Sequence, residues 1–94
     1  MKFIRYTAHL ELRLKLRGIP HHIPEKIYRT SHERYWDSAT VKCIALKRVT
    51  IGGRIREYAL TYEESAETIA LITIHPLKAL QKQNRIRSRR WQPL

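Results

Sequence analysis

The first long stretch with a regular hydrophobic pattern, "HLELRLKLRGIP" at residues 9–20, alternates leucine with charged residues. Strict alternation is the period of a β-strand. Residues 10–17 are nevertheless all good helix formers without β-branches, and Thr7 and Gly18 are typical helix caps. These features favour a helix from Thr7 to Arg17 over a strand. Its leucines would lie on two nearly opposite sides, so we expect apolar cover on both.

The pattern then changes from helical to extended. Residues 22–31, "HIPEKIYRTS", predict a short second helix, because a proline and a glutamate suit its first turn. Residues 41–51 and 54–63 are rich in β-branched and aromatic residues and flank Gly52-Gly53, which predicts a hairpin. "TIALITIH" at 68–75 is the most apolar segment and predicts a central strand. "KFIRY" at 2–6 could form a short first strand.

Pro76 ends the last strand, and residues 77–91, "LKALQKQNRIRSRRW", predict a basic C-terminal helix or tail. On a helix, Lys78, Lys82, Arg85 and Arg89 would form one basic stripe. The whole pattern predicts one α+β domain spanning residues 1–94. In it, two N-terminal helices pack on a small antiparallel sheet of three to four strands.

The net charge of the chain indicates the kind of partner that it binds. Nineteen lysines and arginines against eight acidic residues give a net charge of +11. Such a surface suits a polyanion, above all a nucleic acid, although an acidic protein could also neutralise it. After Glu67 the sequence contains six basic residues and no acidic one. We expect this end of the chain to contact phosphate rather than to be only a solvated tail.

Several function classes are disfavoured. The single cysteine, Cys43, excludes an internal disulfide and a cysteine-rich zinc site, and the adjacent His21 and His22 lack a third metal ligand. No motif of a phosphate-binding-loop ATPase, serine hydrolase or metalloprotease occurs. The beginning, "MKFIRYTAHL", lacks the features of a signal peptide, and no apolar run could span a membrane. We therefore expect a cytoplasmic protein without metal or cofactor.

The residue types suit RNA cleavage without a metal ion. That reaction needs a base, an acid and cations that stabilise the phosphorane. On a helix, His9, Arg13 and Arg17 stack along one edge, and His75 at a strand end is the second histidine. We predict these four as catalytic residues. The predicted RNA-binding residues are Lys47, Arg48, Lys78, Lys82, Arg85, Arg89, Arg90 and, for base stacking, Trp91.

A resemblance supports this interpretation. The segment "YTAHLELRLKLRGIP" resembles the opening of a family of short prokaryotic domains of unknown function, and "NRIRSRRW" resembles its ending. Thr7, His9, Arg13, Arg17 and Gly18-Ile19 match its T-x-H opening with two spaced arginines. The family is grouped with RelE-like and barnase-like RNase toxins of toxin–antitoxin modules. The resemblance favours the helix and implies an RNase-toxin domain. Leu10 departs from the small residue usual there.

Three hypotheses about function follow. The first is a metal-independent endoribonuclease of the type II toxin kind, which acts on RNA or ribosome-bound mRNA and is neutralised by an acidic, antitoxin-like protein. The second is a basic nucleic-acid-binding module without catalysis. The third is an interaction subunit whose charge holds it to an acidic protein. The first predicts loss of cleavage on His9→Ala, and the second predicts salt-sensitive binding without cleavage.

Overall fold

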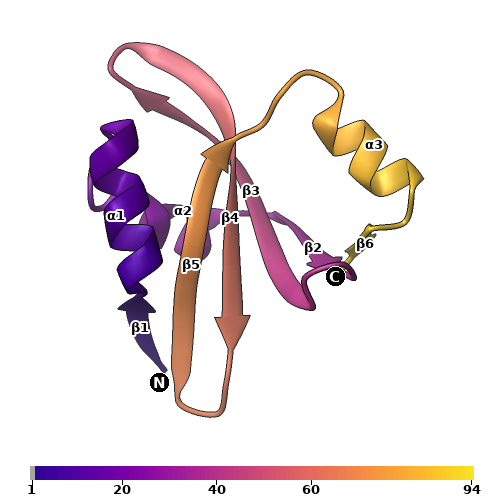
Figure 1. Cartoon of the computed structure of the whole chain (residues 1–94), viewed down its shortest axis with the longest axis horizontal. Helices are drawn as coiled ribbons and strands as arrows, with labels where there is room; N and C mark the ends of the chain where they lie inside the picture. The colour runs from indigo at the N-terminus through magenta and orange to yellow at the C-terminus, as the bar shows by residue number, and fades with distance from the viewer. Residues whose placement is uncertain (1) are drawn as a thin grey trace.

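The computed structural model describes residues 2–94 and contains three helices and six strands (Figure 1). In chain order the elements are β1 (Phe3–Tyr6), α1 (Ala8–Arg17), α2 (Ile23–Thr30), β2 (Glu33–Asp37), β3 (Lys42–Ile51), β4 (Arg54–Glu64), β5 (Thr68–Pro76), α3 (Gln81–Arg87) and β6 (Trp91–Pro93). Within residues 2–94, no helix is both long and apolar enough to cross a membrane.

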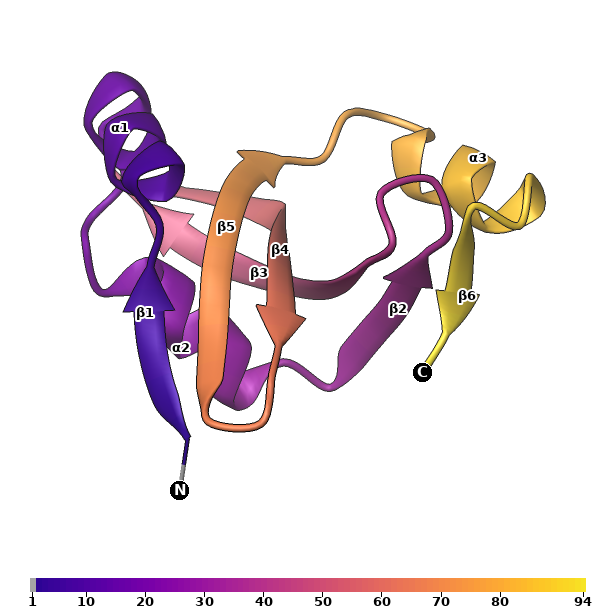
Figure 2. The same ribbon diagram turned by 60° about the horizontal axis from the view of Figure 1, so that its bottom comes forward.

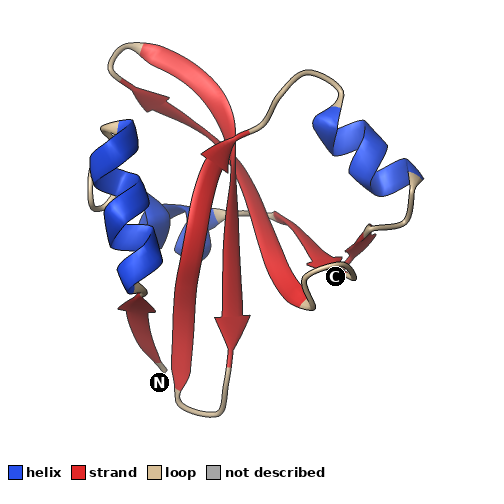
Figure 3. Cartoon of the chain, in the orientation of Figure 1, coloured by secondary structure: helices blue, strands red, loops and turns tan. Residues whose placement is uncertain are grey.

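The predicted antiparallel sheet of three to four strands is wrong. All six strands form one sheet in the order β1-β5-β4-β3-β2-β6, and β1 runs parallel to β5 while the other pairs are antiparallel (Figure 3). The strands that the prediction lacked are β2, which pairs with its neighbour in sequence β3, and the three-residue β6, which pairs with β2 at one edge of the sheet. The pairing of β6, and that of β1 with β5 at the other edge, depends on contacts distant in sequence, which a local pattern does not reveal.

Helix α1 forms as the capping residues predict. The Thr7 hydroxyl accepts a hydrogen bond from the Leu10 amide at 3.1 Å, and Gly18 ends the helix at a φ of 64°. The expected apolar cover on two sides is wrong, because Leu10 and Leu14 are buried whereas Leu12 and Leu16 are exposed. Of the four alternating leucines, Leu10 and Leu14 therefore form the buried face of the helix, and Leu12 and Leu16 form an exposed apolar pair on the other side.

The predicted C-terminal helix over residues 77–91 is also wrong in extent. Helix α3 covers only Gln81–Arg87, and residues on both sides of it, Leu80 and Arg89, have a left-handed backbone with φ of 64°. Trp91 then begins β6, which pairs with β2. The basic stripe is therefore broken: Lys78 lies in the loop before α3 and Arg89 in the turn after it.

The two faces of the sheet have separate apolar cores. Helices α1 and α2 pack on one face through a cluster that includes Leu10, Ile27 and Leu60. On the other face a smaller cluster joins Trp91 to β2, β3 and β4. Helices α1 and α3 lie at opposite ends of the sheet, and α2 lies on the face turned away from the viewer in Figure 1 and below the sheet in Figure 2.

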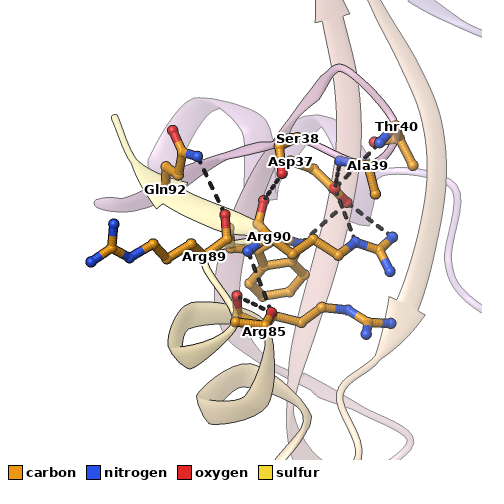
Figure 4. Close-up of polar contacts among 10 residues, drawn as sticks. Asp37, Ser38, Ala39, Thr40, Arg85, Arg89, Arg90 and Gln92 are labelled. Atoms are coloured by element: carbon orange, nitrogen blue, oxygen red, sulfur yellow. Dashed lines mark hydrogen bonds and ion pairs between the residues drawn. The ribbon is translucent and has the colours of Figure 1, made fainter.

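A buried carboxylate fastens the C-terminal segment. Asp37 at the end of β2 is 2% exposed and accepts hydrogen bonds from the Arg90 guanidinium at 3.0 and 3.2 Å (Figure 4). The Trp91 indole N–H donates to the same carboxylate at 3.2 Å, and the amides of Ala39 and Thr40 donate at 2.9 and 3.3 Å. Burial raises the pKa of Asp37, but these hydrogen bonds outweigh burial and leave the pKa below its ordinary value.

We predict that Asp37→Asn lowers the free energy of unfolding by about 2–4 kcal/mol, because it leaves Arg90 without its charge partner. Urea unfolding followed by tryptophan fluorescence measures this. The stabilisation is present above the ordinary aspartate pKa and is lost as the pH falls through the lowered pKa of Asp37. The control Glu63→Gln breaks an exposed ion pair with Lys42 and changes stability by under about 1 kcal/mol. Equal losses in both variants contradict the prediction.

Candidate active site

Helix α1 lies beside the half of β5 that β1 leaves unpaired. Strand β1 pairs with β5 only over Thr68 to Leu71. Thr7 then donates from its amide to the Leu71 carbonyl at 3.1 Å and from its hydroxyl to the Ile72 carbonyl at 3.2 Å. Arg17, at the other end of the helix, lines a small cavity together with Pro76. The helix therefore presents its arginines along the C-terminal half of β5, where His75 lies.

His75 points away from the face that α1 and α2 cover. Its β4 partner is Ala59, Ala59 pairs with Leu46, and Leu46 pairs with Glu33. Directly paired residues point to the same face of a sheet, so these four form one row across four strands. Leu46 and Ala59 belong to the apolar cluster beneath the C-terminal segment. The imidazole thus lies on the face next to that segment.

Positive charges converge on the half-buried imidazole of His75. Burial holds the pKa of His75 below its ordinary value of 6.5. Four cations from α1, α3 and the β5–α3 loop lower this pKa further, in decreasing order Arg17, Arg85, Arg13 and Lys78. Each of these cations disfavours a positive charge on the nearby imidazole ring of His75. The neutral, proton-accepting form of His75 is therefore favoured near neutral pH.

His9 joins this group through Arg13. The Arg13 Nε donates to His9 Nε2 at 3.4 Å, one helical turn away, and the His9 side chain is exposed. The predicted edge of His9, Arg13 and Arg17 is thus present on α1. The structure brings two of its three members, Arg13 and Arg17, into electrostatic range of His75.

The predicted RNA-binding residues divide by location. Lys78 and Arg85 lie near His75. Arg48 pairs with Glu57 two residues along from the His75 row, so it lies on the same face, whereas Lys47 pairs with Tyr58 of the helix-covered core although it also borders the groove described below. Successive strand residues alternate between faces, which explains the separation of Lys47 from Arg48.

The remaining predicted RNA contacts have other partners. Lys82 lies 2.6 Å from Glu33 and 3.7 Å from Glu57. Arg90 pairs with Asp37, and Trp91 is 3% exposed and stacks on Tyr35, so these side chains hold the fold together. The Arg89 side chain extends away from the side to which Arg85 and Arg90 extend (Figure 4).

A groove of about 670 Å³ lies beside the His75 row. Strands β2, β3 and β4 form one wall, with Glu33, Arg48 and Glu57, and the loop after β5 and the start of α3 form the other, with Lys78 and Lys82. Lys78 both lines this groove and acts on the pKa of His75. Leu46 and Glu33 of the His75 row also line this groove, so the groove opens on the same face of the sheet as His75.

Sequence reasoning missed Asp37 and Glu57. Counting outward from the Gly52-Gly53 turn pairs residue 48 with residue 57, so the hairpin signal could have placed Glu57 beside Arg48. No comparable local signal existed for Asp37, whose partner Arg90 is 53 residues away.

Of the histidine pair in the α1–α2 loop, His21 has structural contacts. His21 lies 2.8 Å from Glu11 and stacks on Tyr6, at a centroid distance of 4.5 Å. In the described part of the chain, no three His, Cys, Asp or Glu side chains gather as a metal site requires.

Comparisons of this chain with protein-family models, with curated proteins and with solved structures found no match. The resemblance of the opening segment to RNase-toxin domains stays a prediction.

We predict that His75 titrates below pH 6.5, and that Arg17→Gln moves its pKa upward because one of the four repelling charges is removed. NMR titration of the imidazole resonances measures both. Arg54→Gln, an exposed arginine in the hairpin, serves as the control and leaves the titration unchanged. An Arg17→Gln protein in which His75 titrates as in the parent chain contradicts the arrangement.

Proposed function

We propose that this protein is a metal-independent endoribonuclease of the toxin type that acts in the cytoplasm. The observation that carries the proposal is the convergence of four cations from three parts of the chain on one half-buried histidine. Like charges gather at a cost unless an anion occupies the space between them. A phosphate group fits such a site, and a neutral imidazole beside it can accept a proton.

The residues have distinct roles in the proposed reaction. His75 takes the proton from the ribose 2′-hydroxyl, and the 2′-oxygen attacks the adjacent phosphorus. Arg13 and Arg17 stabilise the added negative charge of the phosphorane, since guanidinium groups match phosphate oxygens in pairs. The bond from phosphorus to the 5′-oxygen then breaks, and His9 gives a proton to that oxygen from the ring nitrogen that Arg13 does not contact. The products carry a 2′,3′-cyclic phosphate and a free 5′-hydroxyl.

Substrate binding itself changes the pKa of His75. A bound phosphodiester offsets the surrounding cations, so the proton that His75 accepts is better held in the complex than in the free protein. The free protein keeps the base neutral, and the bound anion raises its affinity for the proton. This coupling supports a base that works near neutral pH.

The alternative function is nucleic-acid binding without catalysis. The net charge of +11 favours it, because charge alone supplies affinity for any polyanion. Under either function we propose an acidic, antitoxin-like protein as a partner that covers the same basic surface.

We predict that the purified protein cleaves end-labelled single-stranded RNA in EDTA, with 2′,3′-cyclic phosphate ends. His75→Ala lowers the rate by about a hundredfold or more through loss of the base. Arg17→Ala has a comparable effect through loss of charge stabilisation. His9→Ala also lowers it. Gel electrophoresis of the products, with and without added ribosomes, gives the rates.

The matched control is His22→Ala. His22 is an exposed loop residue whose side chain makes no capping hydrogen bond, so this variant leaves the cleavage rate unchanged. Circular dichroism checks that each variant is folded. RNA binding without cleavage, with and without ribosomes, excludes the enzyme and leaves the binding module. Equal activity of wild type and His75→Ala excludes the proposed site.

A further inference from the structure

The groove beside the cationic site contains two carboxylates among four basic residues, Lys47, Arg48, Lys78 and Lys82. Two of the eight acidic residues of the chain, Glu33 and Glu57, line it. A carboxylate repels a phosphate but accepts hydrogen bonds from N–H groups. The groove therefore suits an uncharged part of a nucleotide that carries N–H donors, while the phosphate remains beside His75.

The carboxylates of Glu33 and Glu57 differ in how many hydrogen bonds they already accept. Glu33 accepts from the Tyr35 hydroxyl at 2.6 Å and contacts Lys82 at 2.6 Å. Glu57 lies 3.7 Å from Lys82, beyond hydrogen-bond length, and its side chain is 27% exposed. An ionised carboxylate has about four acceptor positions, so Glu57 retains capacity for a ligand.

Lys82 keeps the Glu33 carboxylate charged. Burial raises the pKa of Glu33, but hydrogen bonds from Lys82 and Tyr35 outweigh burial and lower it. The hydrogen bond to Glu33 raises the pKa of Lys82 and the negative charge of Glu57 raises it further, so the ammonium stays with the carboxylates. The sequence prediction gave Lys82 to RNA phosphate, whereas the structure gives it a role in holding Glu33 and Glu57 in place.

Cations complete the groove. Arg48 faces Glu57 across the strand pair, and Lys78 lies on the opposite wall. Among the four RNA bases, guanine alone offers adjacent ring N–H and amino donors on one edge together with two acceptors, O6 and N7, on another. Carboxylates match the first edge, and arginine or lysine matches the second. A volume of about 670 Å³ is within the range of small-ligand sites.

We propose that this groove is a nucleobase subsite that selects guanine through the Glu57 carboxylate. The proposal rests on the proposed function in one respect, which is that the cationic site beside His75 holds the neighbouring phosphate. Lys78 lies at the junction between the two subsites.

The test uses binding rather than cleavage. Guanosine, adenosine, cytidine and uridine 3′-monophosphates are titrated into the protein, and calorimetry gives each Kd. The expected result is tightest binding of the guanosine nucleotide. In Glu57→Gln its affinity falls by about tenfold, since one oxygen acceptor becomes a donor, while that of the uridine nucleotide changes by under about twofold.

The matched control is Glu63→Gln, which breaks a Glu–Lys pair on β4 outside the groove and leaves all four constants unchanged. Equal affinities for the four nucleotides, or a guanosine preference that persists in Glu57→Gln, overturn the subsite. Because the readout is affinity, a chain that prefers guanosine nucleotide yet never cleaves RNA refutes the ribonuclease and keeps the subsite. A chain that cleaves RNA without base preference refutes the subsite alone.

Discussion

The buried ion pair between Asp37 and Arg90 is the interaction on which the position of the C-terminal segment depends. Helix α3 has no buried residue of its own, so little apolar contact holds it directly. Lys82 of the helix contacts Glu33 and Glu57, and the residues that follow add the main anchor, where Arg90 and Trp91 bind one carboxylate and β6 extends the sheet. Since Asp37 is buried, its charge is stable only with these donors in place. The carboxylate and the C-terminal segment therefore require each other.

This attachment determines what faces His75. Arg85 lies on the short helix that the Asp37 contacts hold, and Lys78 lies in the loop that enters it. The other two cations come from α1, which is fixed independently by Thr7 and by its buried leucines. The cationic site therefore lies between two parts of the chain with separate anchors. Such a site can form only in the folded protein, which is the preorganisation that charge stabilisation requires.

The local elements could be predicted from the sequence and the long-range ones could not. Thr7 and Gly18 mark α1, and Gly52-Gly53 marks the hairpin, because each acts on its immediate neighbours. The parallel pairing of β1, the strand at Trp91 and the partner of Arg90 all depend on residues more than fifty positions away. Helical spacing placed Arg13 and Arg17 on one edge, but only the docking of α1 beside β5 brings them to His75. Arg90 and Trp91 resembled RNA contacts because the sequence does not show that Asp37 binds them.

The two carboxylates of the groove, Glu33 and Glu57, address a problem that the net charge creates. A chain with a net charge of +11 attracts any polyanion, and it does so equally at every phosphate along the backbone. Charge alone therefore gives affinity but does not fix the position at which a nucleic acid binds. Carboxylates held among the cations repel phosphate locally and leave only one favourable way to place a nucleotide, with its phosphate at the arginines and its base at the glutamates. Lys82 makes this possible, because it compensates two negative charges that would otherwise repel each other. In the proposed complex, the few acidic side chains determine where the nucleotide binds, while the many basic ones determine how strongly.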